Sequence, residues 1–284
     1  MDSIEQVFVA GAGQMGQGIA QVVASAGMNV HLYDLQEAPL RAAIEKIAWS
    51  LEKLQAKGVI TESPEAILSR ITTSTNLTDA DGADLIIEAV PEDEAIKRDL
   101  FQKLEALVPT HALLTTNTSA IRISSLASAT RRPDQFCGLH FFNPVPMMPL
   151  VEVVRAEQTS EATVSLISAF AERIGKRPVH VKGDRAGFIV NRILGAAMIE
   201  AMRILESGSA TASDIDQAMR LGCGWKMGPL ETADLAGLDI VIQMCGVMQV
   251  DNTDQVFAPP ATLRELVAKG DLGRKTGQGF YPYS

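Results

Sequence analysis

Residues 6–16 read QVFVAGAGQMG, a short apolar run followed by three closely spaced glycines. The run predicts a buried strand, and apolar residues at helical spacing after the glycines predict a helix. A Gly-x-Gly-x-x-Gly pattern is a weak signal alone, but between a strand and a helix it is typical of a dinucleotide-binding turn. There Gly11 bends the chain, Gly13 lets the backbone approach a pyrophosphate, and Gly16 lets the helix pack closely on the strand. The candidate cofactor residues of this segment are Gly11, Gly13, Gln14, Met15 and Gly16.

An acidic residue, Asp34, follows the next strand-like run, residues 30–33, about twenty residues after the glycines. A carboxylate at this place accepts hydrogen bonds from the ribose hydroxyls of an adenosine, although a simple turn aspartate is the other interpretation. The same carboxylate would repel a 2′-phosphate, and the neighbouring Leu35 and Gln36 bring no arginine to bind one. The sequence therefore predicts NAD rather than NADP as the cofactor.

Up to residue 183, strand-like runs alternate with amphipathic stretches, which indicates βαβ units and a largely parallel sheet. Beyond it we expect helices, among them residues 188–206, a helix capped by Ser213 and a helix that opens at Pro229. The predicted fold class is α/β, with a Rossmann-type, largely parallel sheet domain (residues 1–183) followed by a smaller all-α domain (residues 184–284). The expected strands lie at residues 6–10, 30–33, 85–87, 113–115, 136–139, 151–154 and 179–181.

The expected helix 188–206 is apolar over most of its circumference. Its polar residues Arg192, Glu200, Arg203 and Glu206 lie on one side, and the buried side includes Met198 and Met202. So wide an apolar face needs cover on more than one side. We therefore expect a homodimer that assembles mainly through residues 184–284.

Composition excludes several classes of protein. The chain has 284 residues, 46% of them hydrophobic, and a net charge of −9, which argues against non-specific nucleic-acid binding. Its three cysteines, Cys137, Cys223 and Cys245, are far apart, so neither a disulfide framework nor a structural metal site is expected. The first residues carry no basic region, and no apolar run reaches the length of a membrane span. We expect a cytoplasmic enzyme without a membrane partner.

Two ionisable residues lie in strand-like runs. His140 ends one apolar run, and Glu152 lies inside another. A buried glutamate costs several kcal/mol unless a partner compensates it. Each residue alone has an ordinary explanation, a core histidine or an edge-strand charge, but a histidine held by a glutamate is suited to be a general base.

Five motifs make the chain similar to the L-3-hydroxyacyl-CoA dehydrogenase family, and most closely to its short stand-alone bacterial members. They occur in the family's order and span nearly the whole chain. Trp225-Lys226 departs from the family, which commonly has an aromatic residue or histidine followed by proline there, and this puts the local turn in doubt. The motifs are residues 117–119, 138–154, 187–192, 227–230 and 273–281.

The resemblance implies reversible oxidation of an L-3-hydroxyacyl-CoA, with 3-hydroxybutyryl-CoA as the expected substrate, by NAD and without a metal, as in fatty-acid β-oxidation. His140 would be the general base and Glu152 would orient it, while Ser119 and Asn191 would hydrogen-bond the substrate oxygens. The implied contacts to NAD, besides the glycine motif and Asp34, are Glu92, Lys97, Ser119, Asn143 and Lys275. The implied contacts to CoA are Ser50 and Lys57.

Two alternatives remain open. A dehydrogenase of a free 3-hydroxy acid or sugar acid would need an arginine to clamp the carboxylate, and the sequence shows none clearly. A non-catalytic NAD-binding protein is the second, and the presence of Ser119, His140, Glu152 and Asn191 argues against it.

Overall fold

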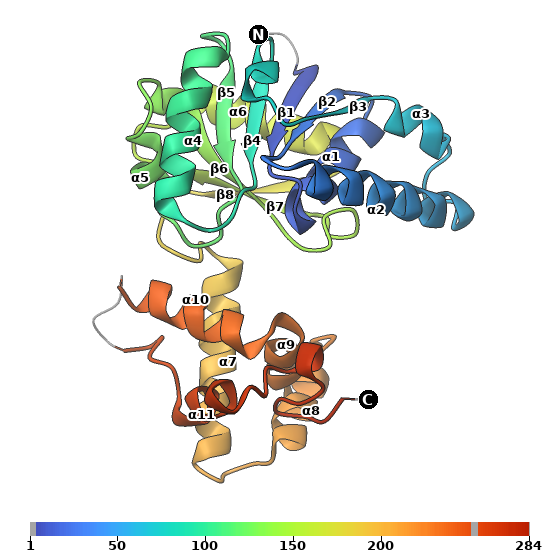
Figure 1. Cartoon of the computed structure of the whole chain (residues 1–284). Helices are drawn as coiled ribbons and strands as arrows, with labels where there is room; N and C mark the ends of the chain where they lie inside the picture. Colours follow the sequence, from blue (N-terminus) through green and yellow to red (C-terminus); the bar gives the residue numbers. More distant parts are fainter. Residues whose placement is uncertain (1–3, 251–254, 284) are drawn as a thin grey trace. The chain divides into compact units, whose positions relative to one another are not determined.

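The computed structural model describes residues 4–250 and 255–283 and contains two compact units, residues 1–184 and 185–284 (Figure 1). The first unit contains the sheet, and the second is helical. Their division lies one residue beyond the expected end of the first domain.

The first unit has an eight-stranded sheet in the order β3-β2-β1-β4-β5-β6-β7-β8. All neighbouring strands are parallel except β6 and β7, so the predicted largely parallel sheet is confirmed. The sequence missed β3, because its polar residues after Ile71 give no apolar run. The strands are β1 (Gln6–Ala10), β2 (Asn29–Tyr33), β3 (Ile71–Ser74), β4 (Leu85–Glu88), β5 (Leu113–Thr116), β6 (Phe136–Phe141), β7 (Leu150–Arg155) and β8 (Arg177–Val181).

Helices pack on the two faces of this sheet, because alternate residues of a strand point to opposite faces. On one face Val7 and Val9 of β1 share a core with Ile19 of α1. On the other, Phe101 of α4 contacts Phe136 of β6 with ring centroids 4.7 Å apart. The helices are α1 (Gln14–Ser25), α2 (Glu37–Ala56), α3 (Pro64–Leu68), α4 (Glu94–Leu107), α5 (Ile123–Ala127) and α6 (Glu161–Arg173), with short 3₁₀ turns η1 (Leu77–Ala80) and η2 (Pro133–Gln135).

The strand order places functional side chains at one edge of the sheet. β1 lies between β2 and β4, which is where the strand order reverses, and ligands of such sheets bind beyond the carboxyl ends of the strands at this point. The antiparallel pair β6–β7 sets His140 directly opposite Glu152. Directly opposed residues project from the same face, so these two side chains must meet.

In its described residues, 185–250 and 255–283, the second unit has five helices around an apolar core that includes Met198, Met202 and Leu230. The long helix begins at Val190 and not at residue 188 as expected, because Phe188 has a left-handed backbone with φ of 47°. The helices are α7 (Val190–Glu206), α8 (Ala212–Cys223), α9 (Pro229–Ala236), α10 (Leu238–Val250) and α11 (Ala261–Lys269), followed by the 3₁₀ turn η3 (Arg274–Thr276).

Two expected helix starts in this unit have different outcomes. The prediction that Ser213 caps this helix is wrong, because α8 begins at Ala212 and the hydroxyl of Thr211 accepts the N–H of Asp214. Pro229 opens α9 as predicted. Trp225-Lys226 departs from the family pattern, but the start of α9 after it is still fixed. The buried carboxylate of Asp216 accepts the N–H groups of Leu230 and Glu231 in the first turn of that helix.

In the part of the chain that the structure describes, no single helix is both long and apolar enough to cross a membrane. The pair α9 and α10 meets the criterion by combined length and composition, with a bend of 100° between the two helices.

Thiol reactivity tests the burial that the two cores create. Cys137 and Cys245 are buried, and burial raises the pKa of their thiols to about 12 and about 11, whereas Cys223 is exposed. Because the thiolate is the reactive form, we expect one equivalent of a disulfide reagent to react with the native protein at pH 8. Cys223→Ser should abolish this fast reaction, and all three thiols of the wild type should react in denaturant. Fast reaction of the native Cys223→Ser protein would contradict the two buried cores.

Candidate active site

The glycine turn between β1 and α1 leaves space for a ligand at one position only. Gly11 has φ of 107°, and a Cβ there would lie 2.5 Å from the Ala89 carbonyl oxygen. A Cβ on Gly16 would lie 1.7 Å from the Gly11 oxygen. A Cβ on Gly13, in contrast, would meet no described atom within 4 Å. The fold itself thus requires Gly11 and Gly16, while Gly13 leaves open the space that a pyrophosphate needs.

Asp34 follows β2 and bonds to the glycine turn. Its carboxylate accepts hydrogen bonds from the backbone N–H groups of Ala12, at 3.0 Å, and Gln36, at 3.3 Å. A cavity of about 640 Å³ extends from Gly13 and Met15 past Asp34 to Pro91 in the loop after β4. The lining of this cavity fits an adenosine and its ribose, and the contact of Asp34 to that ribose stays a prediction.

The histidine and the glutamate form a buried pair. Nδ1 of His140 lies 2.8 Å from Oε2 of Glu152, and both side chains are buried. A ring nitrogen that donates its hydrogen to a carboxylate is held in one tautomer and one orientation. The second nitrogen, Nε2, is then the atom that can accept a proton, which is the arrangement a general base requires.

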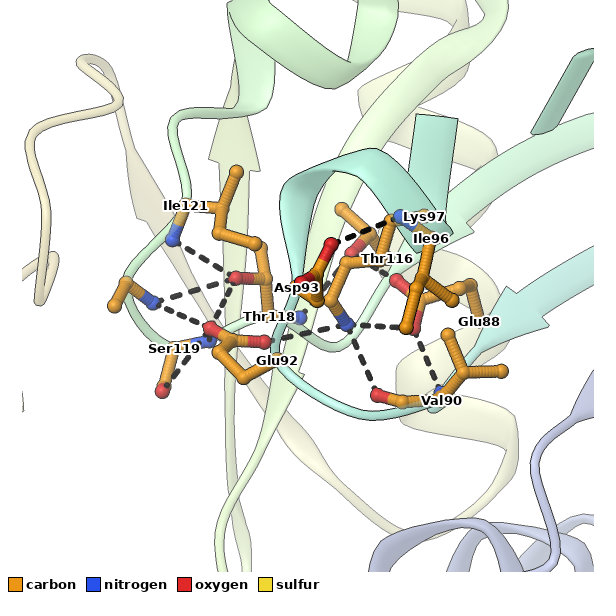
Figure 2. A network of polar contacts seen from close by, with 11 residues as sticks. Glu88, Val90, Glu92, Asp93, Ile96, Lys97, Thr116, Thr118, Ser119 and Ile121 are labelled. Atoms are coloured by element: carbon orange, nitrogen blue, oxygen red, sulfur yellow. Dashed lines mark hydrogen bonds and ion pairs between the residues drawn. The ribbon is translucent and has the colours of Figure 1, made fainter. Parts of the chain in front are cut away.

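Glu92 is hydrogen-bonded to the turn that contains Ser119 (Figure 2). Its Oε1 accepts hydrogen bonds from the Thr118 hydroxyl at 2.5 Å and from the backbone N–H groups of Ser119 and Ala120, both at 3.0 Å. Its Oε2 lies 3.2 Å from the ammonium of Lys97. Burial alone would raise the pKa of Glu92, but the lysine and the hydrogen bonds bring it below the ordinary value.

Lys97 is buried, with its ammonium inside the unit. It lies 2.6 Å from Oε1 of Glu88 and 3.2 Å from the Val90 carbonyl oxygen, in addition to Glu92. Burial raises the pKa of Glu88 despite these contacts. Sequence reasoning missed Glu88, although it ends an apolar run as His140 does, and that was the signal that could have found it.

The loop between β6 and β7 brings Asn143 to the glycine turn. Gln14, the first residue of α1, donates a hydrogen bond to Oδ1 of Asn143 at 3.1 Å. Lys176 holds the same loop by donating to the carbonyl oxygens of Val145, at 2.5 Å, and Met148, at 2.9 Å. The structure thus places the expected cofactor residues Gln14 and Asn143 side by side.

A second cavity, of about 720 Å³, lies between α2 and this loop. Ser50 and Lys57 line it, as does Trp49, whose ring carries the Lys53 ammonium 5.5 Å from its centroid. Its charged lining residues are all cationic, Lys46, Lys53 and Lys57, although the chain as a whole is acidic. The cavity therefore suits an anionic ligand. The sequence had not identified Lys46, Trp49 or Lys53, which share the helical face of Ser50 and Lys57.

The remaining two candidates belong to the helical unit. Asn191 lies half-buried in the first turn of α7. Lys275 contacts both carboxylate oxygens of Asp239, at 2.5 and 2.6 Å. Their contacts to substrate and cofactor stay predictions. Among residues 4–250 and 255–283, no group of three His, Cys, Asp or Glu side chains is placed to hold a metal ion.

A glycine turn with an acidic residue after β2, together with a histidine–glutamate pair in the same unit, defines a nicotinamide-dependent dehydrogenase. The comparisons agree. Residues 6–185 match the family model "3-hydroxyacyl-CoA dehydrogenase, NAD binding domain", and residues 187–283 match "3-hydroxyacyl-CoA dehydrogenase, C-terminal domain". The chain belongs to the 3-hydroxyacyl-CoA dehydrogenase family, and NAD is its cofactor.

Similar proteins come from bacteria and animals. A probable 3-hydroxybutyryl-CoA dehydrogenase of Deinococcus radiodurans is 44% identical, over 97% of this chain and 99% of its own. The mitochondrial hydroxyacyl-coenzyme A dehydrogenase of Sus scrofa is 43% identical, over 99% of this chain and 91% of its own. The crystal structure of (S)-3-hydroxybutyryl-CoA dehydrogenase from Ralstonia eutropha superposes with a TM-score of 0.95, at 41% identity over 99% of this chain and 100% of that chain.

Two alanine variants of the glycine turn separate binding from folding. Gly13→Ala has open space for its methyl group, so we expect near-normal thermal stability but strongly weakened NADH binding in a fluorescence titration. Gly16→Ala drives its methyl group into the backbone of Gly11, so it should lower the free energy of unfolding by at least about 1–3 kcal/mol. Normal NADH affinity in Gly13→Ala would show that the pyrophosphate does not lie on this turn.

Proposed function

We propose that this protein catalyses the reversible oxidation of an L-3-hydroxyacyl-CoA, in the first place 3-hydroxybutyryl-CoA, to the 3-ketoacyl-CoA. The observation that carries the proposal is the buried His140–Glu152 pair, with 2.8 Å between ring nitrogen and carboxylate, in a chain of this family. The names of its bacterial relatives support the short-chain substrate.

The proposed proton transfer uses His140 and Glu152. Nε2 of His140 takes the proton of the substrate hydroxyl, and the Glu152 carboxylate balances the charge of the resulting imidazolium. Ser119 and Asn191 hydrogen-bond the substrate oxygens, Ser119 the one whose charge changes in the step. NAD, when bound, supplies the hydride acceptor for this chemistry. In the reverse direction His140 returns its proton to the same oxygen.

The cavity along α2 supports a CoA thioester over a free acid. We propose that Ser50 and Lys57, together with Lys46 and Lys53, face the phosphate groups of CoA. A free hydroxy acid would call for an arginine beside its carboxylate, and neither described cavity is lined by one.

Oxidation of NADH, followed by its absorbance, tests this proposal. We expect turnover with acetoacetyl-CoA and very little with free acetoacetate at equal concentration. His140→Ala should bind NADH normally and lose about 10²–10⁴-fold in kcat, because a positioned general acid contributes that much. His111→Ala, which changes an exposed histidine beside Asp84, is the matched control and should keep full activity. Preference for acetoacetate would contradict the substrate class, and an active His140→Ala would contradict the assignment of the acid.

We further propose that the helical unit forms a homodimer, on different grounds from those the sequence offered. Met198 and Met202 of α7 are buried in the core of their own unit, so the wide apolar face of that helix is largely covered. Helix α10 gives a stronger reason to expect a dimer, because it is apolar on nearly all sides and its residues Ile240, Val247 and Val250 are exposed. Homodimer and cytoplasmic location both stay predictions.

A charge on α10 tests the dimer. Val247→Glu places a carboxylate on the exposed apolar side and should convert a dimer to monomers in sedimentation velocity at micromolar concentration. Gln217→Glu, which adds the same charge at an exposed position of α8, is the control and should sediment as the wild type does. Monomeric wild type, or a Val247→Glu protein that stays dimeric, would show that α10 is not the interface.

A further inference from the structure

Glu88 has no place in the proposed proton transfer, yet it is completely buried at the carboxyl end of β4. It lies between Ala10 of β1 and Thr116 of β5 in the register of the sheet. Both of its oxygens are used: Oε1 accepts from the Val90 N–H at 2.8 Å and from Lys97 at 2.6 Å, and Oε2 accepts from the Thr116 hydroxyl at 2.6 Å (Figure 2).

One branch of hydrogen bonds runs from Glu88 through Thr116. The Thr116 hydroxyl, which donates to Glu88, also accepts the N–H of Thr118 at 3.2 Å. The backbone takes part as well, because the carbonyl oxygen of Glu88 accepts the N–H of Asn117 at 2.8 Å. The Asn117 side chain in turn accepts the N–H of Phe141, the residue after His140, at 2.8 Å.

The second branch runs through Lys97 and Glu92. Lys97 bridges the carboxylates of Glu88 and Glu92, and Glu92 accepts the backbone N–H groups of Ser119 and Ala120. Both branches end on the same short turn, residues 118–121. The Thr118 hydroxyl closes this turn by accepting the N–H of Ile121 at 2.9 Å.

Stability alone does not account for this arrangement. A buried ion pair contributes little to stability compared with apolar side chains of the same volume, whereas loss of one partner leaves an uncompensated charge. What the pair does supply is fixed geometry, since a fully bonded polar network permits a single arrangement of its members. The member that faces substrate in the proposed function is Ser119.

We propose that Glu88 is a positioning residue for the reaction: through Thr116 on one side and Lys97–Glu92 on the other, it fixes the 118–121 turn and thereby the hydroxyl of Ser119. The inference rests on the proposed function, in which Ser119 bonds the reacting oxygen. It also gives Lys97 a role, because its buried ammonium acts on the site through Glu92.

A double-mutant cycle of Glu88→Gln with Ser119→Ala tests the proposal. If Glu88 acts through Ser119, Glu88→Gln lowers kcat with acetoacetyl-CoA on the order of tenfold in the wild type and less than about twofold when Ser119 is already alanine. An equal loss in both backgrounds would mean that Glu88 acts only on the fold, and a fully active Ser119→Ala protein would overturn the proposal as well.

Hydrogen exchange measured by mass spectrometry gives a readout independent of activity. Glu88→Gln and Thr116→Val should each speed exchange of the amides at residues 117–121 without changing the exchange of β1. Thr115→Val is the matched control, since the Thr115 hydroxyl bonds the Ile86 carbonyl oxygen outside the network, and it should leave the turn protected. If Glu88→Gln fails to fold, Thr116→Val carries the test.

These measurements keep the two proposals apart. A wild type inactive toward every CoA thioester would contradict the proposed function while the exchange experiment still reports on the network. Unchanged protection of residues 117–121 in both Glu88→Gln and Thr116→Val would overturn the positioning role even in a fully active enzyme.

Discussion

The carboxylate of Glu152 is completely buried on β7, between β6 and β8, and such a group is tolerated only with a partner. The antiparallel pairing of β6 with β7 supplies that partner by setting His140 directly opposite. The interaction is therefore set by strand register, which packing of the whole sheet determines, and not by a flexible loop. The constraint that makes the fold possible also fixes the orientation of the histidine ring.

The same constraint explains why the other polar groups gather where they do. In β4, β6 and β7 the residues that alternate with Glu88, His140 and Glu152 belong to one apolar core on the opposite face of the sheet. With a period of two, all three side chains must then project from the other face. The Asn117 side chain connects this face to the Ser119 turn by accepting the amide of Phe141. Glu88, His140 and Glu152 thus project from one face of the sheet, the first two near the carboxyl ends of β4 and β6 and the third beside His140 on antiparallel β7.

Sequence patterns predict the parts of this fold that rest on apolar periodicity, namely seven of the eight strands, the glycine turn and the main helices. They fail where local hydrogen bonds decide, as at the cap of α8, where the hydroxyl of Thr211, and not that of Ser213, accepts the N–H of Asp214. They also fail at Glu88. The resemblance names Lys97 as a contact to NAD, and only the structure shows that its ammonium is buried against Glu88.

In the described part of the helical unit the buried carboxylates are bonded to backbone N–H groups and tyrosine hydroxyls, and not to a histidine or a lysine. Asp216 accepts hydrogen bonds from the amides of Leu230 and Glu231 and from the Tyr281 hydroxyl, and Asp234 bonds the amides of Phe280 and Tyr281 and the Tyr283 hydroxyl. These contacts join the motifs 227–230 and 273–281 into one structural element. Amides and tyrosine hydroxyls do not change charge near neutral pH, and burial with these bonds raises the pKa of Tyr283 further, to about 12. A buried carboxylate with such partners can only hold structure, whereas Glu152, opposite a histidine, can support the gain and loss of a proton.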